Sequence, residues 1–314
     1  MFKIIMYTVG VDIGGTNIKI GLVLPDGNIA ASSSIPTVPE KGYVLTVDDI
    51  CREIKALSNG DAVRAIGVGI PGIADSAAGM VRLAVNLRWK NVMLAAEFHK
   101  HFQVPVRLSN DANCAALGEQ RFGSGKGHRD MIFITIGTGV GSGIIIKGRL
   151  IEGNRSAGGE AGHMLLKMNG EKCGCGRRGC WEAYASATAL IKQTQRAAAK
   201  APESILANTV NKTGAVNGKT AFTAAEAGCE VGKAVVRQYI KYVSEGLINL
   251  TNILHPEVFV IGGGVSHEGD GLILPLEHAV NEYIRCSGMY PEIAVRRASL
   301  GNKAGLLGAA ALVL

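Results

Sequence analysis

Apolar residues along this chain gather in short runs that glycine turns separate. Residues 7–24 contain VGVDIGG and then TNIKIGLVL, and the polar turn Pro25-Asp26-Gly27 follows. Two β-rich runs on either side of a Gly-Gly turn predict a β-hairpin. Residues 132–153, IFITIGTGVGSGIIIKGRLIEG, repeat the same plan. The distance between the two copies exceeds the about 20–50 residues of a solenoid repeat, so we predict a duplicated domain plan.

Further apolar runs predict an alternation of strands and helices, which is typical of an α/β fold. The expected strands cover residues 64–70, 104–109 and 257–261, and the expected helices cover residues 113–122, 182–200, 230–254 and 304–314. His255-Pro256 ends the third of these helices, because proline cannot continue a helix. We predict a smaller domain at residues 1–121, completed by the C-terminal helix 304–314, and a larger domain at residues 122–303.

The composition agrees with two folded domains. The chain has 314 residues, of which 47% are apolar and 19% charged, so intrinsic disorder is excluded. Glycine is abundant, at 42 residues, but has no G-X-Y period, which excludes collagen. The net charge of +7 comes from scattered residues, so it supports an anionic small ligand better than a nucleic acid.

The sequence contains nothing that predicts membrane insertion or export. No run of about 18 apolar residues occurs, and residues 1–8 contain one lysine and no A-x-A cleavage pattern. We therefore expect a cytoplasmic protein without a membrane partner.

Two glycine turns are candidates for phosphate binding. Asp12-Ile13-Gly14-Gly15-Thr16-Asn17 combines a carboxylate, two glycines that can take positive φ, a hydroxyl and an amide. Glycines allow backbone N–H groups to approach an anion closely. An ordinary hairpin turn is the alternative for one such motif, but Gly137-Thr138-Gly139 occupies the equivalent point of the repeat. Two such loops can hold one polyphosphate.

The seven cysteines are unevenly spaced, and three of them cluster at Cys173, Cys175 and Cys180, downstream of His163. Three thiolates and one imidazole complete a tetrahedral zinc shell, and a closed four-ligand shell is typical of structural zinc. Buried or redox-active thiols are the alternative. Glu160 and Glu182 flank this cluster, and carboxylates accept hydrogen bonds from vicinal hydroxyls, although either residue alone is explained as a surface acid.

The segment Ser109-Asn110-Asp111-Ala112-Asn113 follows a predicted strand and precedes a predicted helix. Asn113 is explained as the N-cap of that helix. Asp111 lies at the carboxyl end of a strand, where α/β folds place ligand chemistry. Its carboxylate could take the proton from an attacking hydroxyl, as phosphoryl transfer to a sugar requires.

In combination these residues resemble the ROK family of bacterial sugar kinases and sugar-responsive repressors, over residues 9–314. The motifs that carry the resemblance are DIGGT at 12–16, NDAN at 110–113, GTGVGSG at 137–143, GEAGH at 159–163 and CGCGRRGCWEAYAS at 173–186. The resemblance implies a two-domain actin-like ATPase fold, related to ribonuclease H, with an interdomain cleft and a structural zinc knuckle.

The resemblance also implies roles for individual residues. The expected general base is Asp111, and Asp12 is expected to orient Mg²⁺ or its waters. ATP is expected at Gly14, Gly15, Thr16, Asn17, Gly137, Thr138 and Gly139, with Gly262, Gly263 and Gly264 near the adenosine. The sugar is expected at Asn86, Asn110, Asp111, Glu160, His163 and Glu182, and structural Zn²⁺ at His163, Cys173, Cys175 and Cys180.

The activity that the resemblance implies is ATP-dependent phosphorylation of a hexose at its primary hydroxyl, with glucose as the first expectation. N-acetylmannosamine, allose and fructose are alternatives that the sequence does not separate, and polyphosphate is an alternative donor. A sugar-responsive repressor is disfavoured, because the first strand begins by Tyr7 and no helix-turn-helix is predicted before it. A homodimer or homotetramer is expected, with closure of the domains on the sugar.

Overall fold

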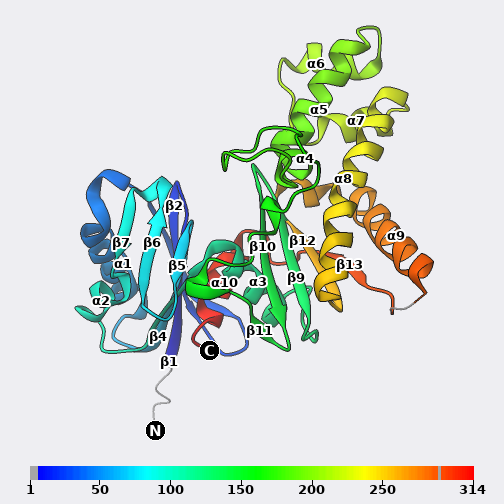
Figure 1. Cartoon of the computed structure of the whole chain (residues 1–314). Helices are drawn as coiled ribbons and strands as arrows, with labels where there is room; N and C mark the ends of the chain where they lie inside the picture. Colours follow the sequence, from blue (N-terminus) through cyan, green and yellow to red (C-terminus); the bar gives the residue numbers. More distant parts are fainter. Residues whose placement is uncertain (1–5, 289–290) are drawn as a thin grey trace. The chain divides into compact units, whose positions relative to one another are not determined.

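Two five-stranded sheets of the same topology form the framework of the chain (Figure 1). The computed structural model describes residues 6–288 and 291–314, so the expectation about a leader at residues 1–5 lies outside it. The first sheet has the order β3 (Ile29–Pro36), β2 (Asn17–Val23), β1 (Met6–Ile13), β4 (Ala62–Ile70) and β8 (Val106–Asn110). The second has the order β11 (Arg149–Leu150), β10 (Val140–Ile146), β9 (Met131–Ile136), β12 (Val258–Gly262) and β13 (Ala294–Arg297).

In both sheets the first strand in sequence is central. Its hairpin partner lies on one side, and two parallel strands lie on the other, since β1 pairs in parallel with β4, and β9 with β12. The hairpin of β1 and β2 is antiparallel, with Ile13 opposite Ile18. The predicted duplication of one plan is thus confirmed.

The chain divides into two units that we describe separately. Unit 1 comprises residues 1–129, 143–159 and 299–314, and unit 2 comprises residues 130–142 and 160–298. The division falls within β10. Residues 122–129, 143–159 and 299–303 belong to unit 1 by their contacts, whereas the sequence assigned them to the larger domain. The predicted boundaries of the two domains stay a prediction.

In unit 1 the two faces of the first sheet are covered differently. The strand residues Val9, Val11 and Ile66 pack with Ile50 of helix α1 (Gly42–Ser58) in one apolar core. The remaining elements of the unit are α2 (Leu94–His99), α3 (Asp111–Phe122), α10 (Ala304–Ala311) and the small sheet of β5 (Ile73–Asp75), β6 (Met80–Ala84) and β7 (Trp89–Val92).

On the other face, glycines in register allow helix α10 to lie against the strand backbones. Gly10 of β1 is opposite both Gly21 of β2 and Gly67 of β4. A Cβ atom on Gly10 would lie 2.2 Å from the carbonyl oxygen of Leu306, and one on Gly67 would lie 1.7 Å from that of Ala309. Because backbone oxygens cannot retreat as a flexible side chain can, these glycines set the distance between α10 and the sheet.

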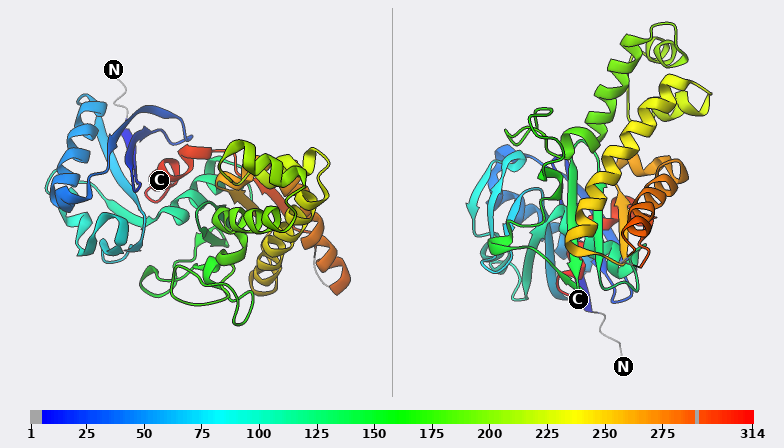
Figure 2. Two further views of the ribbon diagram at one scale, coloured as in Figure 1. Left: turned by 90° about the horizontal axis from the view of Figure 1, so that it is seen from above. Right: turned by 45° about the vertical axis from the view of Figure 1, so that its right-hand side comes forward.

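The helices of unit 2 are α4 (Glu182–Ala185), α5 (Ala187–Lys200), α6 (Ile205–Thr213), α7 (Thr220–Glu226), α8 (Glu230–Leu254) and α9 (Asp270–Ser287). Helices α8 and α9 lie side by side (Figure 2). The expected helix 230–254 is confirmed, and His255 ends it in the left-handed conformation. The expected helix 182–200 is wrong in one respect, because it breaks at Ser186. Ser186 has an extended backbone, and its hydroxyl oxygen caps α5 by accepting from the N–H of Ala189.

Across residues 6–288 and 291–314, none of the helices combines the length and the apolar character needed to cross a bilayer.

Candidate functional site

The parallel strands of unit 1 bring two of the predicted acids to one edge of the first sheet. Asp12 near the end of β1 lies opposite Gly69 of β4, and Ile70 of β4 lies opposite Asn110 at the end of β8. Asp111 follows directly as the first residue of α3. With β4 between them, strands β1 and β8 are two strand spacings, or about 10 Å, apart.

Asp12 is a half-buried carboxylate with two kinds of neighbour. The ammonium group of Lys19 lies 3.3 Å from its Oδ2. A Cβ atom on Gly305, in the first turn of α10, would lie 2.7 Å from the same oxygen, so only glycine leaves room for this carboxylate. The Asp12 carboxylate therefore lies between the partly exposed Lys19 side chain and the backbone of Gly305.

In the turn after Asp12, backbone carbonyl oxygens accept hydrogen bonds from other groups of the protein. The Asn17 oxygen accepts from the N–H of Gly14 at 2.9 Å, the Gly14 oxygen from the hydroxyl of Thr37 at 2.7 Å, and the Thr16 oxygen from the Thr37 N–H at 2.8 Å. Within the described chain, the N–H groups of Gly15 and Thr16 have no protein partner. Exposed N–H groups of this kind can bind an anion. Positive φ is not part of the arrangement, because neither Gly14 nor Gly15 is among the described glycines with positive φ.

Asn86, an exposed residue of the turn at Val85–Leu87, lies close to this loop. A Cβ atom on Gly15 would be 4.0 Å from the Nδ2 atom of Asn86. The structure therefore brings Asn86 to the candidate phosphate turn, a proximity that the sequence did not indicate.

Asn110 is the N-cap of α3, and the expectation that Asn113 has this role is wrong. The Oδ1 atom of Asn110 accepts from the N–H of Ala112 at 2.8 Å and more weakly from that of Asn113 at 3.4 Å. Its Nδ2 group donates to the carbonyl oxygen of Gly72 at 3.0 Å. The helix begins two residues earlier than expected because Asn110 is still extended and Asp111 is already helical. Asn113 is buried inside the first turn.

Asp111 is exposed, and its Oδ1 accepts from the N–H of Ala112 at 2.8 Å. Behind it lies the thiol of Cys114, which is fully buried. Burial raises the pKa of Cys114 far above its usual range, and the nearby charges of Asp12, Asp111 and Glu152 raise it further. The charges of the three carboxylates thus favour the protonated form of this buried thiol.

Glu152 was not predicted from the sequence, yet it supports the end of β8. Its Oε1 accepts from the hydroxyl of Ser109 at 2.6 Å and from that of Ser76 at 3.0 Å. Ser109 is completely buried and immediately precedes the Asn110-Asp111 pair. The only indication in the sequence is an acidic residue in the turn after the second glycine hairpin, which any solvated loop could contain.

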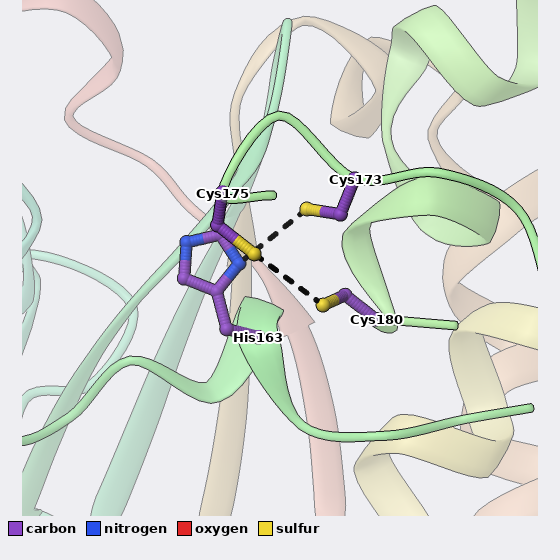
Figure 3. A group of neighbouring side chains, drawn as sticks. All are labelled: His163, Cys173, Cys175 and Cys180. Atoms are coloured by element: carbon purple, nitrogen blue, oxygen red, sulfur yellow. Dashed lines mark hydrogen bonds between the residues drawn. The ribbon is translucent and has the colours of Figure 1, made fainter. Parts of the chain in front are cut away.

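In unit 2 the four predicted zinc ligands converge (Figure 3). One ligand atom from each of His163, Cys173, Cys175 and Cys180 lies within 4.8 Å of the others. The Sγ atoms of Cys175 and Cys180 are 3.7 Å apart, as are Cys173 Sγ and His163 Nδ1. Zinc–sulfur bonds of about 2.3 Å in a tetrahedron require a sulfur–sulfur separation of about 3.8 Å. The residues therefore fit a tetrahedral zinc ion.

The thiols of this cluster have different proton affinities. Burial raises the pKa of Cys173 to about 12, and burial is also the main cause that raises the pKa of Cys180. The pKa of Cys175 is lowered, chiefly by the backbone N–H of Arg177. A metal ion that binds here must displace protons from Cys173 and Cys180, since zinc is bound by thiolates.

In the Gly137–Gly139 turn of unit 2, as in its counterpart in unit 1, backbone carbonyl oxygens accept hydrogen bonds from the protein. The Gly139 oxygen accepts from Gly137 N–H at 3.0 Å, the Gly137 oxygen from Ala187 N–H at 2.9 Å, and the Thr138 oxygen from the Thr188 hydroxyl at 2.8 Å. Among the described residues, the N–H groups of Thr138 and Gly139 have no protein partner. This turn also leaves N–H groups for an anion.

Glu182 adds a side-chain contact to the same turn. Its Oε2 accepts from the N–H of Val140 at 2.9 Å, and its Oε1 lies 3.4 Å from the Sγ atom of Cys173. A Cβ atom on Gly139 would lie 2.3 Å from Oε2, so the carboxylate occupies the space that the glycine leaves. Both oxygens of this predicted sugar ligand thus have partners in the protein.

Glu160 and His163 lie at the start and end of one short turn, in which the His163 N–H donates to the Glu160 carbonyl oxygen at 3.0 Å. The Glu160 side chain is exposed, and no hydrogen bond or ion pair with another described residue engages its carboxylate. Because Nδ1 of His163 faces Cys173, Nε2 is the ring nitrogen left for another partner.

Gly262 is the last residue of β12, and Gly263 and Gly264 follow it. Gly262 lies opposite Thr135 of β9. Gly263 has φ of +82°, and a Cβ atom there would lie 2.4 Å from the carbonyl oxygen of Ile136. Glycine is therefore required for the backbone to approach the residue that precedes the Gly137 turn.

A cavity of about 520 Å³ in unit 2 borders the Thr138–Gly139 peptide. Lys172 and Lys192 line it, together with Arg196, whose guanidinium group pairs with Glu171 at 2.6 Å. The sequence did not indicate these cations, because isolated lysines and arginines are usually exposed to solvent.

The matching mixed sheets, the two amide-rich turns and the Cys/His cluster define an α/β protein with candidate anion and metal sites. The model of the ROK family matches residues 8–314, so the chain belongs to the ROK family.

Three comparisons give the range of its relatives. A glucokinase of Streptomyces coelicolor is 38% identical over 308 residues, which cover 97% of this chain and 96% of that protein. A xylose repressor of Caldicellulosiruptor bescii is 30% identical over 98% of this chain and 77% of the repressor. Among solved structures, a ROK family glucokinase from Streptomyces griseus in complex with glucose and AMPPNP has a TM-score of 0.78 and 38% identity. That match covers 98% of both chains.

Proposed function

We propose that this protein transfers the γ-phosphate of ATP to the primary hydroxyl of a hexose, and that glucose is the preferred hexose. The observation that carries the proposal is the placement of Asp111 as an exposed carboxylate at the carboxyl edge of the first sheet. The similarity to glucokinases along nearly the whole of both chains supports the choice of reaction and sugar.

Asp111 is the proposed general base. As the sugar oxygen forms its bond to the γ-phosphorus and the bond to the β–γ bridging oxygen breaks, the hydroxyl proton passes to a carboxylate oxygen of Asp111, and ADP leaves. The N–H of Ala112 donates to the Oδ1 atom of Asp111, which helps to hold the carboxylate in place.

The phosphate groups are proposed to bind the N–H groups of the two turns. Gly15 and Thr16 supply them in unit 1, and Thr138 and Gly139 in unit 2. Asp12 is proposed to hold Mg²⁺ or its water, which neutralises phosphate charge when bound. Lys192 is proposed to bind a donor phosphate, because it lines the cavity that borders Thr138. Gly262–Gly264 are proposed to border the adenosine.

The sugar hydroxyls are proposed to bind Asn86, Asn110 and Asp111 in unit 1, and Glu160, His163 and Glu182 in unit 2. For Asn110 the cap and the Gly72 contact leave one N–H donor for a sugar oxygen. For Glu160 both carboxylate oxygens remain available as acceptors.

The Cys/His cluster is proposed to hold structural zinc, since all four ligand positions of a tetrahedron are filled by the protein. Zinc there cross-links the chain on both sides of the loop at residues 173–180. The cytoplasm is the proposed compartment, because the reaction consumes ATP and all seven cysteines are unpaired.

The test is a coupled ADP-release assay with glucose, mannose, fructose, allose, N-acetylglucosamine and N-acetylmannosamine. Activity on glucose with the highest kcat/KM of the panel is expected, because one mismatched hydroxyl can cost orders of magnitude. Product formation with polyphosphate in place of ATP is measured in parallel. Absence of turnover with every sugar would refute the proposal.

A further inference from the structure

Besides its proposed contact with the sugar, Glu182 connects the Cys/His cluster to the Gly137–Gly139 turn. It follows Cys180 by two residues and begins α4. One of its oxygens is bonded to the N–H of Val140, directly after the turn, and the other faces the Sγ atom of Cys173. Its backbone therefore follows one candidate metal ligand closely, and its side chain lies beside another.

Three contacts from residues 182–188 hold the turn. The Glu182 carboxylate binds Val140 N–H, the Ala187 N–H binds the Gly137 oxygen, and the Thr188 hydroxyl binds the Thr138 oxygen. Only the first is charge-assisted, and such bonds are roughly twice as strong as neutral ones. Loss of the carboxylate therefore removes the strongest side-chain contact to the turn.

The shape of the turn determines where its N–H groups point. An anion-binding turn acts only when successive N–H groups converge on one point, and a rotation of one peptide plane removes a donor. Glu182 and Gly139 are fitted to each other, since a Cβ atom at position 139 would clash with Oε2 of Glu182. A change in the position of this carboxylate must therefore alter the turn.

From these contacts we infer that Glu182 is a positioning residue for the phosphate donor, through which the metal cluster fixes the Gly137–Gly139 turn. The inference rests on the proposed function. A metal ion bound by Cys173 and Cys180 fixes the chain two residues before Glu182, and the Glu182 carboxylate transmits this constraint to Val140. Nucleotide affinity then depends on the metal even when no sugar is present.

The experiment measures binding of AMPPNP with Mg²⁺, without sugar, by titration calorimetry on the full chain. E182A is expected to bind AMPPNP about tenfold more weakly than wild type. E182Q, whose amide oxygen can still accept from Val140, is expected to lie between the two. T188V removes a turn contact without touching any proposed sugar ligand, so it is expected to weaken AMPPNP binding and leave glucose binding unchanged. E230Q, at an exposed glutamate outside the proposed site, is the matched control, with AMPPNP binding equal to wild type.

The dependence on metal is tested in the same titration. Wild type stripped of metal by a chelator is expected to lose nucleotide affinity, whereas E182A stripped in the same way is expected to lose no more than it has already lost. Such non-additivity identifies residues that act through one another. Thermal unfolding of each variant separates this effect from global destabilisation, and T188V and E182Q decide the question if E182A does not fold.

The outcomes discriminate between the two proposals. If E182A and T188V bind AMPPNP as wild type does while E182A loses glucose affinity, Glu182 serves the sugar alone and the inference is overturned. If metal removal and E182A lower AMPPNP affinity by fully additive amounts, the link between Glu182 and the cluster is overturned. If wild type itself does not bind AMPPNP, the proposed function fails and the inference fails with it.

Discussion

The side-chain amide of Asn110 donates a hydrogen bond to the carbonyl oxygen of Gly72 over 3.0 Å. The same amide caps helix α3 through its oxygen. The side chain of Asn110 therefore connects the start of α3 with the turn after β4. The direction in which α3 begins, and with it the place of the Asp111 carboxylate, depends on this residue.

Substitution of Asn110 separates these two contacts. N110S keeps an oxygen for the helix cap but loses the donor to Gly72, so we expect a loss of about 1 kcal/mol in the free energy of unfolding. N110A loses both contacts, and about 2 kcal/mol is expected. Urea denaturation measures the difference, with N211S on the exposed side of α6 as the control. Equal losses for N110S and N110A would show that the cap contributes nothing.

Replacement of Asp111 by Asn removes the proposed base and keeps the size of the side chain. We expect kcat for glucose phosphorylation to fall by about 10²- to 10⁴-fold. The folded state is expected to persist, because the side chain is exposed and the amide oxygen can still accept from the N–H of Ala112. D26N, a substitution at an exposed turn residue, is the control. Turnover by D111N within a factor of about three of wild type would exclude Asp111 as the base.

The sequence predicted those parts of the site that residue types and local spacing determine. The cluster of Cys173, Cys175, Cys180 and His163 was predicted because its ligands are close in sequence and chemically distinctive, and the four side chains do converge. The glycine hairpins were predicted for the same reason. Their phosphate-binding role stays a prediction, as do the roles of Asp12 and Asp111.

Contacts over long sequence separations could not be predicted in this way. Glu152 supports Ser109 and Ser76 through hydrogen bonds that span 43 and 76 residues. Likewise, the assignment of the helix cap to Asn113 failed because both asparagines of the NDAN motif suit a cap. The choice between them depends on where β8 ends, which is set by its pairing with β4.

A buried carboxylate stabilises the other end of α3. Glu119 is completely buried and accepts from the N–H groups of Ser124 at 2.9 Å, Ser299 at 3.2 Å and Leu300 at 2.8 Å. E119Q turns one acceptor oxygen into an NH₂ group that faces these donors, so we expect about 3 kcal/mol of destabilisation.

Urea denaturation at pH 7 measures this effect, and E230Q is the matched control. The Glu230 carboxylate is exposed and pairs with the side chain of Lys233, so E230Q is expected to change stability by less than about 0.5 kcal/mol. Similar small changes in both variants would contradict the importance of the Glu119 contacts.

The ion pair of Asp75 and Arg82 gives a prediction about pH. The Arg82 guanidinium, and after it the N–H of Ala78, hold the pKa of Asp75 below its usual value. A lowered pKa in the folded state stabilises the protein at pH values above the unfolded pKa of about 3.9, and this contribution is lost as the pH falls through the folded value. R82M is therefore expected to be less stable than wild type between pH 5 and 8, and the difference is expected to shrink as the pH falls below about 4.

Urea denaturation at a series of pH values checks this expectation, with R64M as the control, because Arg64 is exposed and has no ion pair among the described residues. A difference between wild type and R82M that stays constant from pH 7 down to pH 3 would show that Asp75 does not depend on Arg82.

Removal of one cysteine tests the metal cluster. Cys175 is exposed, and its Sγ atom lies 3.7 Å from that of Cys180, so C175S changes a ligand without leaving a cavity in the core. Zinc per chain, measured by elemental analysis after gel filtration, is expected to fall from one equivalent to nearly none, because a serine hydroxyl is a poor zinc ligand at neutral pH. Glucose affinity is expected to fall with it, since His163 and Glu182 lie beside the cluster. C286S, at an exposed cysteine of α9, is the matched control and is expected to keep both zinc and sugar binding. Full retention of zinc by C175S would mean that Cys175 is not a ligand and that the cluster binds metal, if at all, with an open position.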